Sequence, residues 1–151
     1  MSDLLDSGEA FELFKSNIDQ AGTRDRVEIY RDDSDAVLKK MVGRQFDLIF
    51  ADGTHSYVTV KSDIENAMPL IRDGGILCGD DLEMLISESN PPITLKWAEM
   101  GVEYALDPAS GIWFHPGVTV AVAGLFGEVW RKGAAWAVQK SAGQWVPVDA
   151  A

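Results

Sequence analysis

The chain has few of the features that would assign it to several common classes of protein. Its 151 residues include one cysteine, Cys78, which excludes an internal disulfide and makes a reducing cytoplasm the expected compartment. Lysine and arginine number 13 against 24 aspartates and glutamates, and the net charge of −11 disfavours nucleic acid and anionic membranes as partners. No apolar run reaches the roughly 20 residues of a membrane-spanning helix, and no secretory leader is expected. Nucleic acid and membranes are therefore not expected as partners.

The overall amino-acid composition is typical of one globular domain. Hydrophobic residues make up 46% of the chain and charged residues 25%, and 151 residues are enough to bury a core. Because no segment has the composition of a linker, we expect residues 1–151 to form a single domain. Cys78 lies inside an apolar run and is expected to be a small core residue.

Helices and strands are predicted to alternate along the first half of the chain. Apolar residues at helical spacing predict a helix over 8–21, and the alternating segment 26–30 predicts a short strand. A capped helix follows, and then the apolar strand Phe46–Ala51, a helix from about Tyr57 to Arg72 and the apolar strand Ile76–Gly79. This order predicts an α/β fold with a parallel sheet and right-handed crossovers.

The pattern changes after Asp81. We expect a short helix within 82–89, a break at the Asn90–Pro92 segment, and a further helix over 93–100. A helix with Pro116 near its first turn follows, and the tail predicts a β-hairpin around a turn at 141–143.

Acidic residues follow the predicted strands at the points where the strands end. Asp32 and Asp33 follow the first strand, Asp52 the second, and Asp80 and Asp81 the third. The carboxyl ends of parallel strands share one edge of the sheet, where ligands bind. Clustered carboxylates repel one another, and a divalent cation removes that conflict; oxygen ligands suit magnesium, calcium or manganese better than zinc.

His55 lies three residues after Asp52 and is expected to overhang the same site. Its ordinary pKa of about 6.5 suits a general base near neutral pH. Taken singly, each aspartate is also explained as a helix cap or a partner of turn amides, and His55 as a helix-start or packing residue. The joint pattern at matching strand ends favours a functional site. His115 is expected in a loop outside that site, and the five tryptophans in the last third are expected to pack in the core and hairpin.

The segment FDLIFADGTHSYVTVKSDIENAMPLIRDGGILCGDD, residues 46–81, resembles the second half of a class I S-adenosylmethionine-dependent methyltransferase. The matching motifs are a strand that ends in Asp-Gly-x-His-Ser-Tyr and a later Gly-Gly before a strand that ends in Asp-Asp. Upstream, FELFKSNIDQAGTRDRVEIYRDDS is similar to the helix, third strand and acidic turn of the same branch. The resemblance covers roughly residues 10–81 and implies a Rossmann-like sheet with a C-terminal antiparallel β-hairpin.

The resemblance also implies roles for particular residues. In metal-dependent O-methyltransferases of this kind, such as those acting on macrolide sugars, the strand-end acids hold magnesium and the histidine is the base. The implied metal ligands are Asp52, Asp80 and Asp81, and the implied catalytic base is His55. The implied cofactor is S-adenosylmethionine, with Asp33, Ser34 and Asp52 on its binding side and Mg2+ or another divalent cation beside it. The implied activity is metal-assisted O-methylation of a small hydroxylated substrate.

The sequence departs from the family pattern at its N-terminal side. Nothing before Ala10 resembles the glycine-rich loop that lets the backbone approach the cofactor, and the first two strands of the family sheet have no counterpart. We therefore expect an N-terminally truncated, partial methyltransferase domain with reduced cofactor affinity. The strand at Phe46–Ala51 is expected to expose a sheet edge, which segment 26–30 or a second copy of the chain would cover as a homo-oligomer.

Two other functions fit the same residues. One is a truncated, non-catalytic remnant that acts as a metal-binding or interaction module, and the missing glycine-rich loop favours it. The other is an enzyme with different chemistry on the same scaffold, similar to cephalosporin hydroxylases. The retained acids and His55 favour the methyltransferase.

Overall fold

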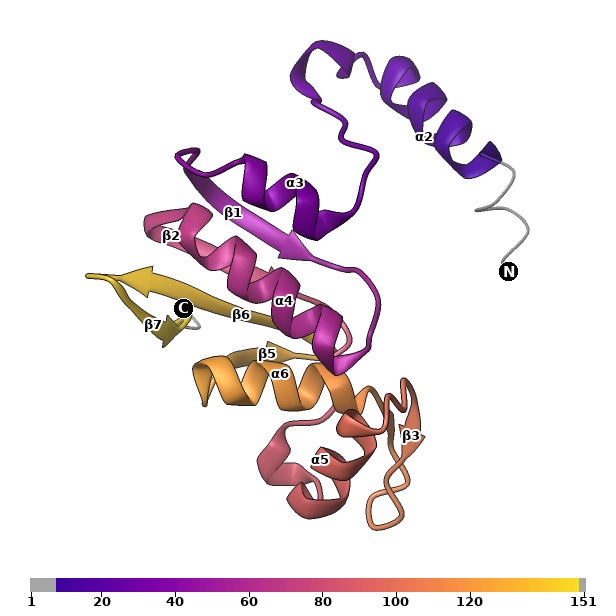
Figure 1. Cartoon of the computed structure of the whole chain (residues 1–151), viewed down its shortest axis with the longest axis vertical. Coiled ribbons are helices and arrows are strands. Elements are labelled where there is room, and N and C mark those ends of the chain that lie inside the picture. The colour runs from indigo at the N-terminus through magenta and orange to yellow at the C-terminus, as the bar shows by residue number, and fades with distance from the viewer. Residues whose placement is uncertain (1–7, 150–151) are drawn as a thin grey trace. The chain divides into compact units, whose positions relative to one another are not determined.

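The computed structural model describes residues 8–149, which divide after Asp32 into two compact units. The first unit contains helix α2 (Glu9–Gln20) and a single 3-10 turn over Arg24–Arg26 (Figure 1). Gly22, with a positive φ of 63°, follows the end of α2, where a left-handed residue is favoured. Helix α2 buries only Ile18. The prediction of one domain over 1–151 stays a prediction.

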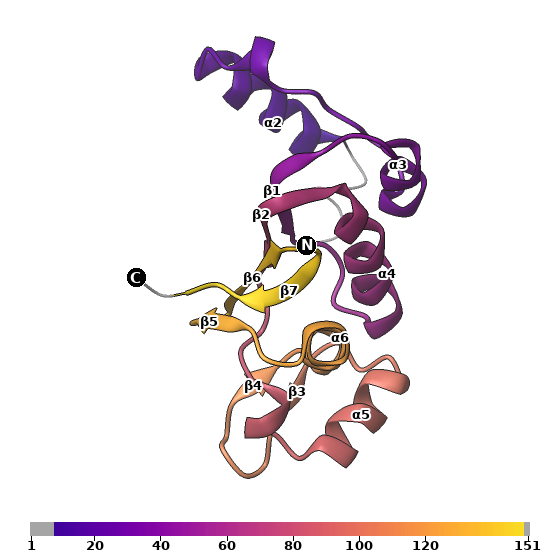
Figure 2. The same cartoon turned by 90° about the vertical axis from the view of Figure 1, so that its left-hand side faces the viewer.

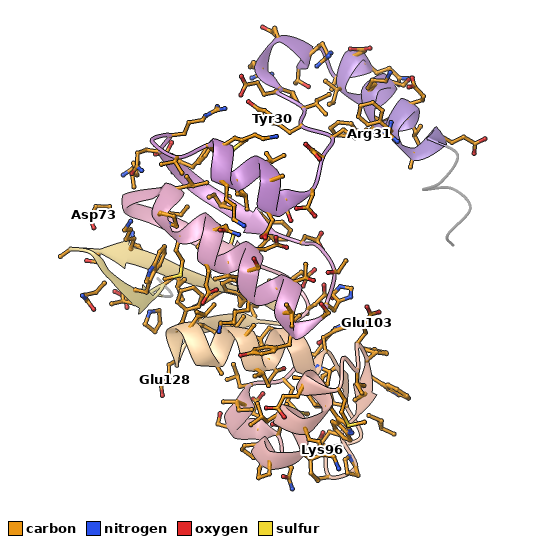
Figure 3. The ribbon with its side chains drawn as sticks, viewed as in Figure 1. Tyr30, Arg31, Asp73, Lys96, Glu103 and Glu128 are labelled. Carbon is orange, nitrogen blue, oxygen red and sulfur yellow. The ribbon has the colours of Figure 1, made fainter. Side chains whose placement is uncertain are left out.

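The predicted strand at 26–30 is wrong, because this segment has no regular structure beyond the 3-10 turn. A strand is stabilised by backbone hydrogen bonds to a neighbour, and no strand in residues 8–149 pairs with this segment. Local contacts occupy its side chains: the Tyr30 hydroxyl donates to Glu28 at 3.1 Å, and the Arg31 guanidinium lies 4.7 Å from the Phe11 ring centre (Figure 3).

The second unit is built on a mixed five-stranded sheet with the order β1-β2-β6-β5, in which β7 also pairs with β6. The strands are β1 (Phe46–Ala51), β2 (Ile71–Gly79), β5 (Trp130–Lys132), β6 (Ala135–Ser141) and β7 (Gln144–Pro147). Strands β1 and β2 are parallel, and the other pairings are antiparallel. The backbone N–H of Gly143 in the β6–β7 turn donates to Asp73 at 3.2 Å, which ties this turn to β2 (Figure 3).

Three helices cover one face of this sheet, as Figure 2 shows: α3 (Ser34–Lys40), α4 (Tyr57–Ala67) and α6 (Pro116–Phe126). Their apolar sides bury a core with the strands, which includes Ile64 from α4, Leu77 from β2, Val118 from α6 and Trp136 from β6. Helix α3 is held to α4 by Asp35, which accepts hydrogen bonds from Ser62 at 2.6 Å and Asn66 at 2.7 Å. These bonds, with the Ser62 bond the strongest influence, hold the pKa of Asp35 below its usual value.

A smaller group of elements lies between β2 and α6. It contains a 3-10 turn (Ile86–Glu88), helix α5 (Pro91–Glu99) and the two short antiparallel strands β3 (Ala105–Leu106) and β4 (Trp113–Phe114). Met84, Ala105 and Phe114 form a second buried cluster under these elements.

Two predicted boundaries in this unit are wrong. The helix expected to reach Arg72 ends at Ala67 and is followed by a 3-10 turn over Met68–Leu70, because Pro69 has no backbone N–H with which to continue the α-helical hydrogen bonds. The helix expected within 82–89 is only the 3-10 turn at Ile86–Glu88. The Glu88 carboxylate accepts from the backbone N–H of Leu85 at 2.8 Å, which closes this single turn, and α5 begins at Pro91.

Gly117 in the first turn of α6 lets this helix approach the loop that carries His55. A Cβ atom at Gly117 would collide with the carbonyl oxygen of His55 and lie 2.6 Å from the backbone nitrogen of Tyr57. Only hydrogen fits there, so the loop and the helix are in direct backbone contact.

Within residues 8–149, no helix combines the length and apolarity that crossing a membrane requires.

The close approach at Gly117 yields a first prediction. The Gly117→Ala variant should lose about 1–3 kcal/mol of unfolding free energy, the usual effect of overpacking, because backbone rather than a flexible side chain would have to move. The matched control is Gly124→Ala in the same helix, where an added Cβ meets nothing within 4 Å. That variant should be stabilised by up to about 1 kcal/mol through helix propensity. Urea unfolding of both variants measures the difference; equal free energies would contradict the packing account.

Candidate functional site

The parallel pairing of β1 and β2 brings two of the predicted acids to one edge of the sheet. Ala51 is opposite Gly79 in the register, so Asp52 and Asp80 are the next residues along the two neighbouring strands. Both are exposed, and both line a small pocket of about 20 Å³ together with Asp81, His55 and Asp63. A space of this size holds roughly one water molecule or ion.

Gly79 allows the two strand ends to approach each other and Trp136. A Cβ atom at this position would lie 2.6 Å from the carbonyl oxygen of Ala51 and 2.8 Å from Nε1 of Trp136. The last residue of β2 therefore has to be glycine. The backbone just before Asp80 and Asp81 is tightly packed against β1 and Trp136.

His55 and Asp81 are in direct contact. Nε2 of His55 lies 2.9 Å from Oδ2 of Asp81, and the two side chains are 33% and 26% exposed. Asp81 has a φ of 65°, a left-handed conformation that a non-glycine residue rarely adopts, and its backbone N–H donates to the Asp80 carboxylate at 3.0 Å. Ser56, the next residue after His55, caps helix α4, so the position of His55 is set by the start of that helix.

His115 is a member of this cluster that the sequence did not indicate, and the expectation that it lies outside the site is wrong. It is the residue immediately before α6, and its ring centre lies 4.2 Å from that of His55. Nδ1 of His115 lies 2.9 Å from Oε1 of Glu83 and 3.7 Å from Oδ1 of Asp81. The sequence signal was weak, because His115 and Glu83 are remote from the Asp-Gly-x-His element and reach it only when α6 packs against α4.

Two further aromatic side chains continue from His115 toward the surface. The ring of Tyr104 lies 4.7 Å from that of His115, and the ring of Trp113 lies 5.2 Å from that of Tyr104 in a stacked arrangement. Tyr104 is 52% exposed and Trp113 is 51% exposed. Trp136 is buried in the core as expected, whereas Trp113 is not.

The two residues expected near the cofactor, Asp33 and Ser34, lie at the start of α3. The Asp33 side chain caps this helix by accepting from the backbone N–H of Ala36 at 3.2 Å. The hydroxyl of Ser34 donates to Asp63 at 2.6 Å, and Asp63 lines the pocket beside Asp52. Ser34 is thus connected to the strand-end pocket through one carboxylate.

The potential metal ligands in residues 8–149 include one group of three whose ligand atoms all lie within 4.8 Å of one another: His55, Asp81 and His115. Asp52 and Asp80 share the pocket with Asp81 but are not in this group. The set predicted from the sequence, Asp52, Asp80 and Asp81, stays a prediction.

Cys78 is half-buried beside β1. Its Sγ lies 3.5 Å from the carbonyl oxygen of Ile49, and burial raises the pKa of its thiol. An unreactive structural cysteine fits this environment.

The fold of the chain is similar to that of a known protein of the O-methyltransferase family. A solved structure titled as an O-methyltransferase family protein from Burkholderia thailandensis superposes with a TM-score of 0.53 at 20% sequence identity, which is a likeness of fold. The match covers 88% of this chain and 41% of that protein, so the chain spans less than half of its length. A comparison with curated proteins gives no match. The family model described as "Methyltransferase domain" matches residues 4–82, which is more than half of the chain. The chain therefore belongs to this methyltransferase-domain family.

Proposed function

We propose that the chain acts in S-adenosylmethionine-dependent O-methylation of a small hydroxylated substrate, with a divalent cation assisting. The observation that carries the proposal is the contact of His55 with Asp81 at the edge where Asp52 and Asp80 also end their strands. Membership of the methyltransferase-domain family supports methyl transfer as the reaction. A base beside clustered carboxylates supports a hydroxyl as the acceptor, because a hydroxyl has to lose its proton when it is methylated.

In this proposal Asp81 determines which nitrogen of His55 acts as the base. A carboxylate only accepts hydrogen bonds, so its contact with Nε2 favours the tautomer that carries the proton on Nε2. Nδ1 then has the free lone pair that accepts the proton of the substrate hydroxyl. The His55 side chain is one-third exposed, which leaves it accessible to a substrate.

The chemistry of the strand-end carboxylates supports a divalent cation in this proposal. Asp52, Asp80 and Asp81 offer oxygen donors around a pocket of about 20 Å³, and oxygen donors are the ligands that Mg2+ prefers. When bound there, a magnesium ion would supply Lewis acidity that lowers the pKa of the substrate hydroxyl. The role of the chain is to hold the three carboxylates in place and to keep His55 beside them.

The fit to the cofactor is partial. Asp33 and Ser34 provide a polar turn at the start of α3, and Ser34 is linked to the pocket through Asp63. Residues 8–149 contain no glycine-rich turn between a strand and a helix ahead of β1. The proposal assigns the adenine side to Asp33 and Ser34 and includes Asp52 on the side of the methyl group. The cytoplasm is the proposed compartment, consistent with the single cysteine.

The aromatic side chains near His115 support a substrate entrance in the segment between β2 and α6. Tyr104 and Trp113 are each about half exposed and form a stacked pair that leads to His115. Such a pair offers an apolar wall for an acceptor molecule.

A non-catalytic remnant is the second candidate function, and the absence of a glycine-rich turn in the described residues favours it. In that case the site would bind metal without transferring a methyl group. The two functions differ in whether the chain binds S-adenosylmethionine, which calorimetry can measure directly.

The role of His55 predicts the result of its substitution. His55→Gln should reduce methyl transfer about 10²- to 10⁴-fold because the hydroxyl proton has no acceptor. The rate is measured by mass spectrometry of methylated hydroxylated test substrates, and calorimetry checks that S-adenosylmethionine affinity is retained. Asp73→Asn, at the opposite end of β2, is the control and should leave the rate unchanged. If neither methyl transfer nor cofactor binding occurs at millimolar S-adenosylmethionine, with or without magnesium, the chain is the non-catalytic remnant.

The oxygen-ligand site predicts a thermal shift with magnesium. Addition of Mg2+ should raise the melting temperature of the chain, because a ligand of the folded state stabilises it. Asp80→Ala and Asp81→Ala should each abolish this shift, whereas Asp73→Asn should retain it. An unchanged shift in both alanine variants would remove the magnesium assignment.

The proposal also includes a homo-oligomer formed through the free edge of β1. Among the strands in residues 8–149, β1 pairs only with β2, and its side chains Leu48 and Phe50 are 55% and 54% exposed. An unpaired, apolar edge strand favours pairing with another strand. Sedimentation should therefore show a dimer or larger species that Leu48→Lys shifts to the monomer. A monomeric unmodified chain would contradict this part of the proposal.

A further inference from the structure

Two imidazoles and two carboxylates form a continuous chain of contacts that the proposed methyl transfer does not fully use. Nε2 of His55 lies 2.9 Å from Oδ2 of Asp81, and Oδ1 of Asp81 lies 3.7 Å from Nδ1 of His115. The same Nδ1 atom lies 2.9 Å from Oε1 of Glu83. The methyl-transfer proposal gives roles to His55 and Asp81 but none to His115 or Glu83.

The charges in this chain of contacts favour a cation. With both imidazoles neutral, Asp81 and Glu83 carry two negative charges, and the protein as a whole has a net charge of −11. Two carboxylates held this close to one imidazole repel each other, and a bound dication relieves that repulsion. Whether an ion can bind depends on whether the donor atoms can surround it.

The donor atoms of three side chains lie close enough together for small side-chain rotations to surround a metal ion. Around a tetrahedral zinc ion with metal–nitrogen bonds of about 2.0–2.1 Å, each pair of ligand atoms lies roughly 3.3–3.4 Å apart. The contact between His55 and Asp81, at 2.9 Å, is already shorter than this spacing. The ligand atoms of His55, Asp81 and His115 all lie within 4.8 Å of one another, so side-chain rotations have to bring the most distant pair closer by no more than about 1.4 Å.

Glu83 holds His115 in the orientation that the group needs. Its Oε1 contacts Nδ1 of the ring, and its Oε2 accepts from the backbone N–H of His115 at 3.2 Å. The backbone carbonyl of Glu83 in turn accepts from Arg131 at 2.6 Å. Because Glu83 contacts Nδ1, Nε2 is the nitrogen of His115 that is left for an ion. A carboxylate on the other ring nitrogen is the usual outer partner of a metal-ligating histidine. The His115 side chain is only 13% exposed, so its position is well constrained.

We propose that His55, Asp81 and His115 bind a borderline transition-metal ion, for which zinc is the probe, with Glu83 as the orienting partner of His115. Two imidazole nitrogens and one carboxylate suit zinc and its neighbours in the first transition row, whereas magnesium prefers oxygen ligands only. The site is therefore different in its chemistry from the one formed by Asp52, Asp80 and Asp81, although the two share Asp81.

The consequence for catalysis rests on the proposed function. A zinc ion on Nε2 of His55 leaves the imidazole proton on Nδ1, the atom that would accept the proton of the substrate hydroxyl. Zinc binding and methyl transfer thus exclude each other at His55. Zinc should inhibit methyl transfer, and a chelator should reverse this inhibition.

Zinc binding by the full 151-residue chain tests the proposal without any need for activity. The chain, first stripped with a chelator, is titrated with Zn2+ in competition with a chromophoric chelator. We expect one zinc ion per chain, bound in the presence of a thousandfold excess of Mg2+. Loss of a ligand in His115→Gln should weaken zinc binding by more than about 100-fold, and Glu83→Gln should weaken it by about 10- to 100-fold. The visible spectrum of the Co2+-loaded chain should show nitrogen ligation that His115→Gln removes.

Two controls separate this site from a simple folding defect and from the magnesium site. His115→Cys replaces one zinc ligand by another and should retain zinc binding, which a merely structural role of His115 would not explain. Asp52→Asn should leave zinc affinity within about twofold of the unmodified chain while it weakens the magnesium effect. Zinc affinity that is absent, equal in the unmodified chain and His115→Gln, or lost in Asp52→Asn would overturn the proposal. Zinc binding without methyl transfer would contradict the proposed function alone, and methyl transfer without zinc binding would contradict this inference alone.

Discussion

The parallel pairing of β1 with β2 is the constraint on which the rest of the site depends. Because Ala51 is opposite Gly79, the chain leaves both strands at the same edge, and the residues that follow have to share that edge. Gly79 has no room for a side chain between β1 and Trp136, so the register and the packing of β6 are coupled. Any change that shifts this register separates Asp52 from Asp80 and Asp81.

The approach of α6 to the loop after β1 adds the second half of the site. Gly117 brings the start of α6 into backbone contact with His55, and His115, just ahead of this helix, is thereby placed against the His55 ring. Asp81 contacts both histidines and has a left-handed backbone conformation. A non-glycine residue in that conformation is strained, and such strain is typically retained where a side chain has a function. The stability of the α6 packing and the geometry of the site are therefore linked.

Local patterns predicted most elements but not their ends. The run from Phe46 to Ala51 is a strand in the structure, and Asp33 and Ser56 cap the helices that follow them. The apolar periodicity after Ser56 predicted a helix that continues to about Arg72. Periodicity alone does not take account of proline, and the helix ends before Pro69. The segment 26–30, in which apolar and polar residues alternate, is not a strand. Such alternation indicates which side chains could be buried, but a strand also needs a neighbouring strand with which to form hydrogen bonds.

The sequence by itself determined that acids would follow two neighbouring strands and that His55 would lie beside them, because strand ends and sequence spacing are local properties. The expectation that both strands are buried is wrong for β1, whose Leu48 and Phe50 are more than half exposed because only β2 pairs with it among the described strands. The motif also indicated the methyltransferase family, which the family match over residues 4–82 supports. Only the tertiary structure brought His115 and Glu83 to the same point, from segments 60 and 28 residues away from His55 in the chain. Their position depends on how α6 packs on α4. Contacts between remote segments are determined by packing of the whole core, and residue spacing along the sequence does not predict that packing.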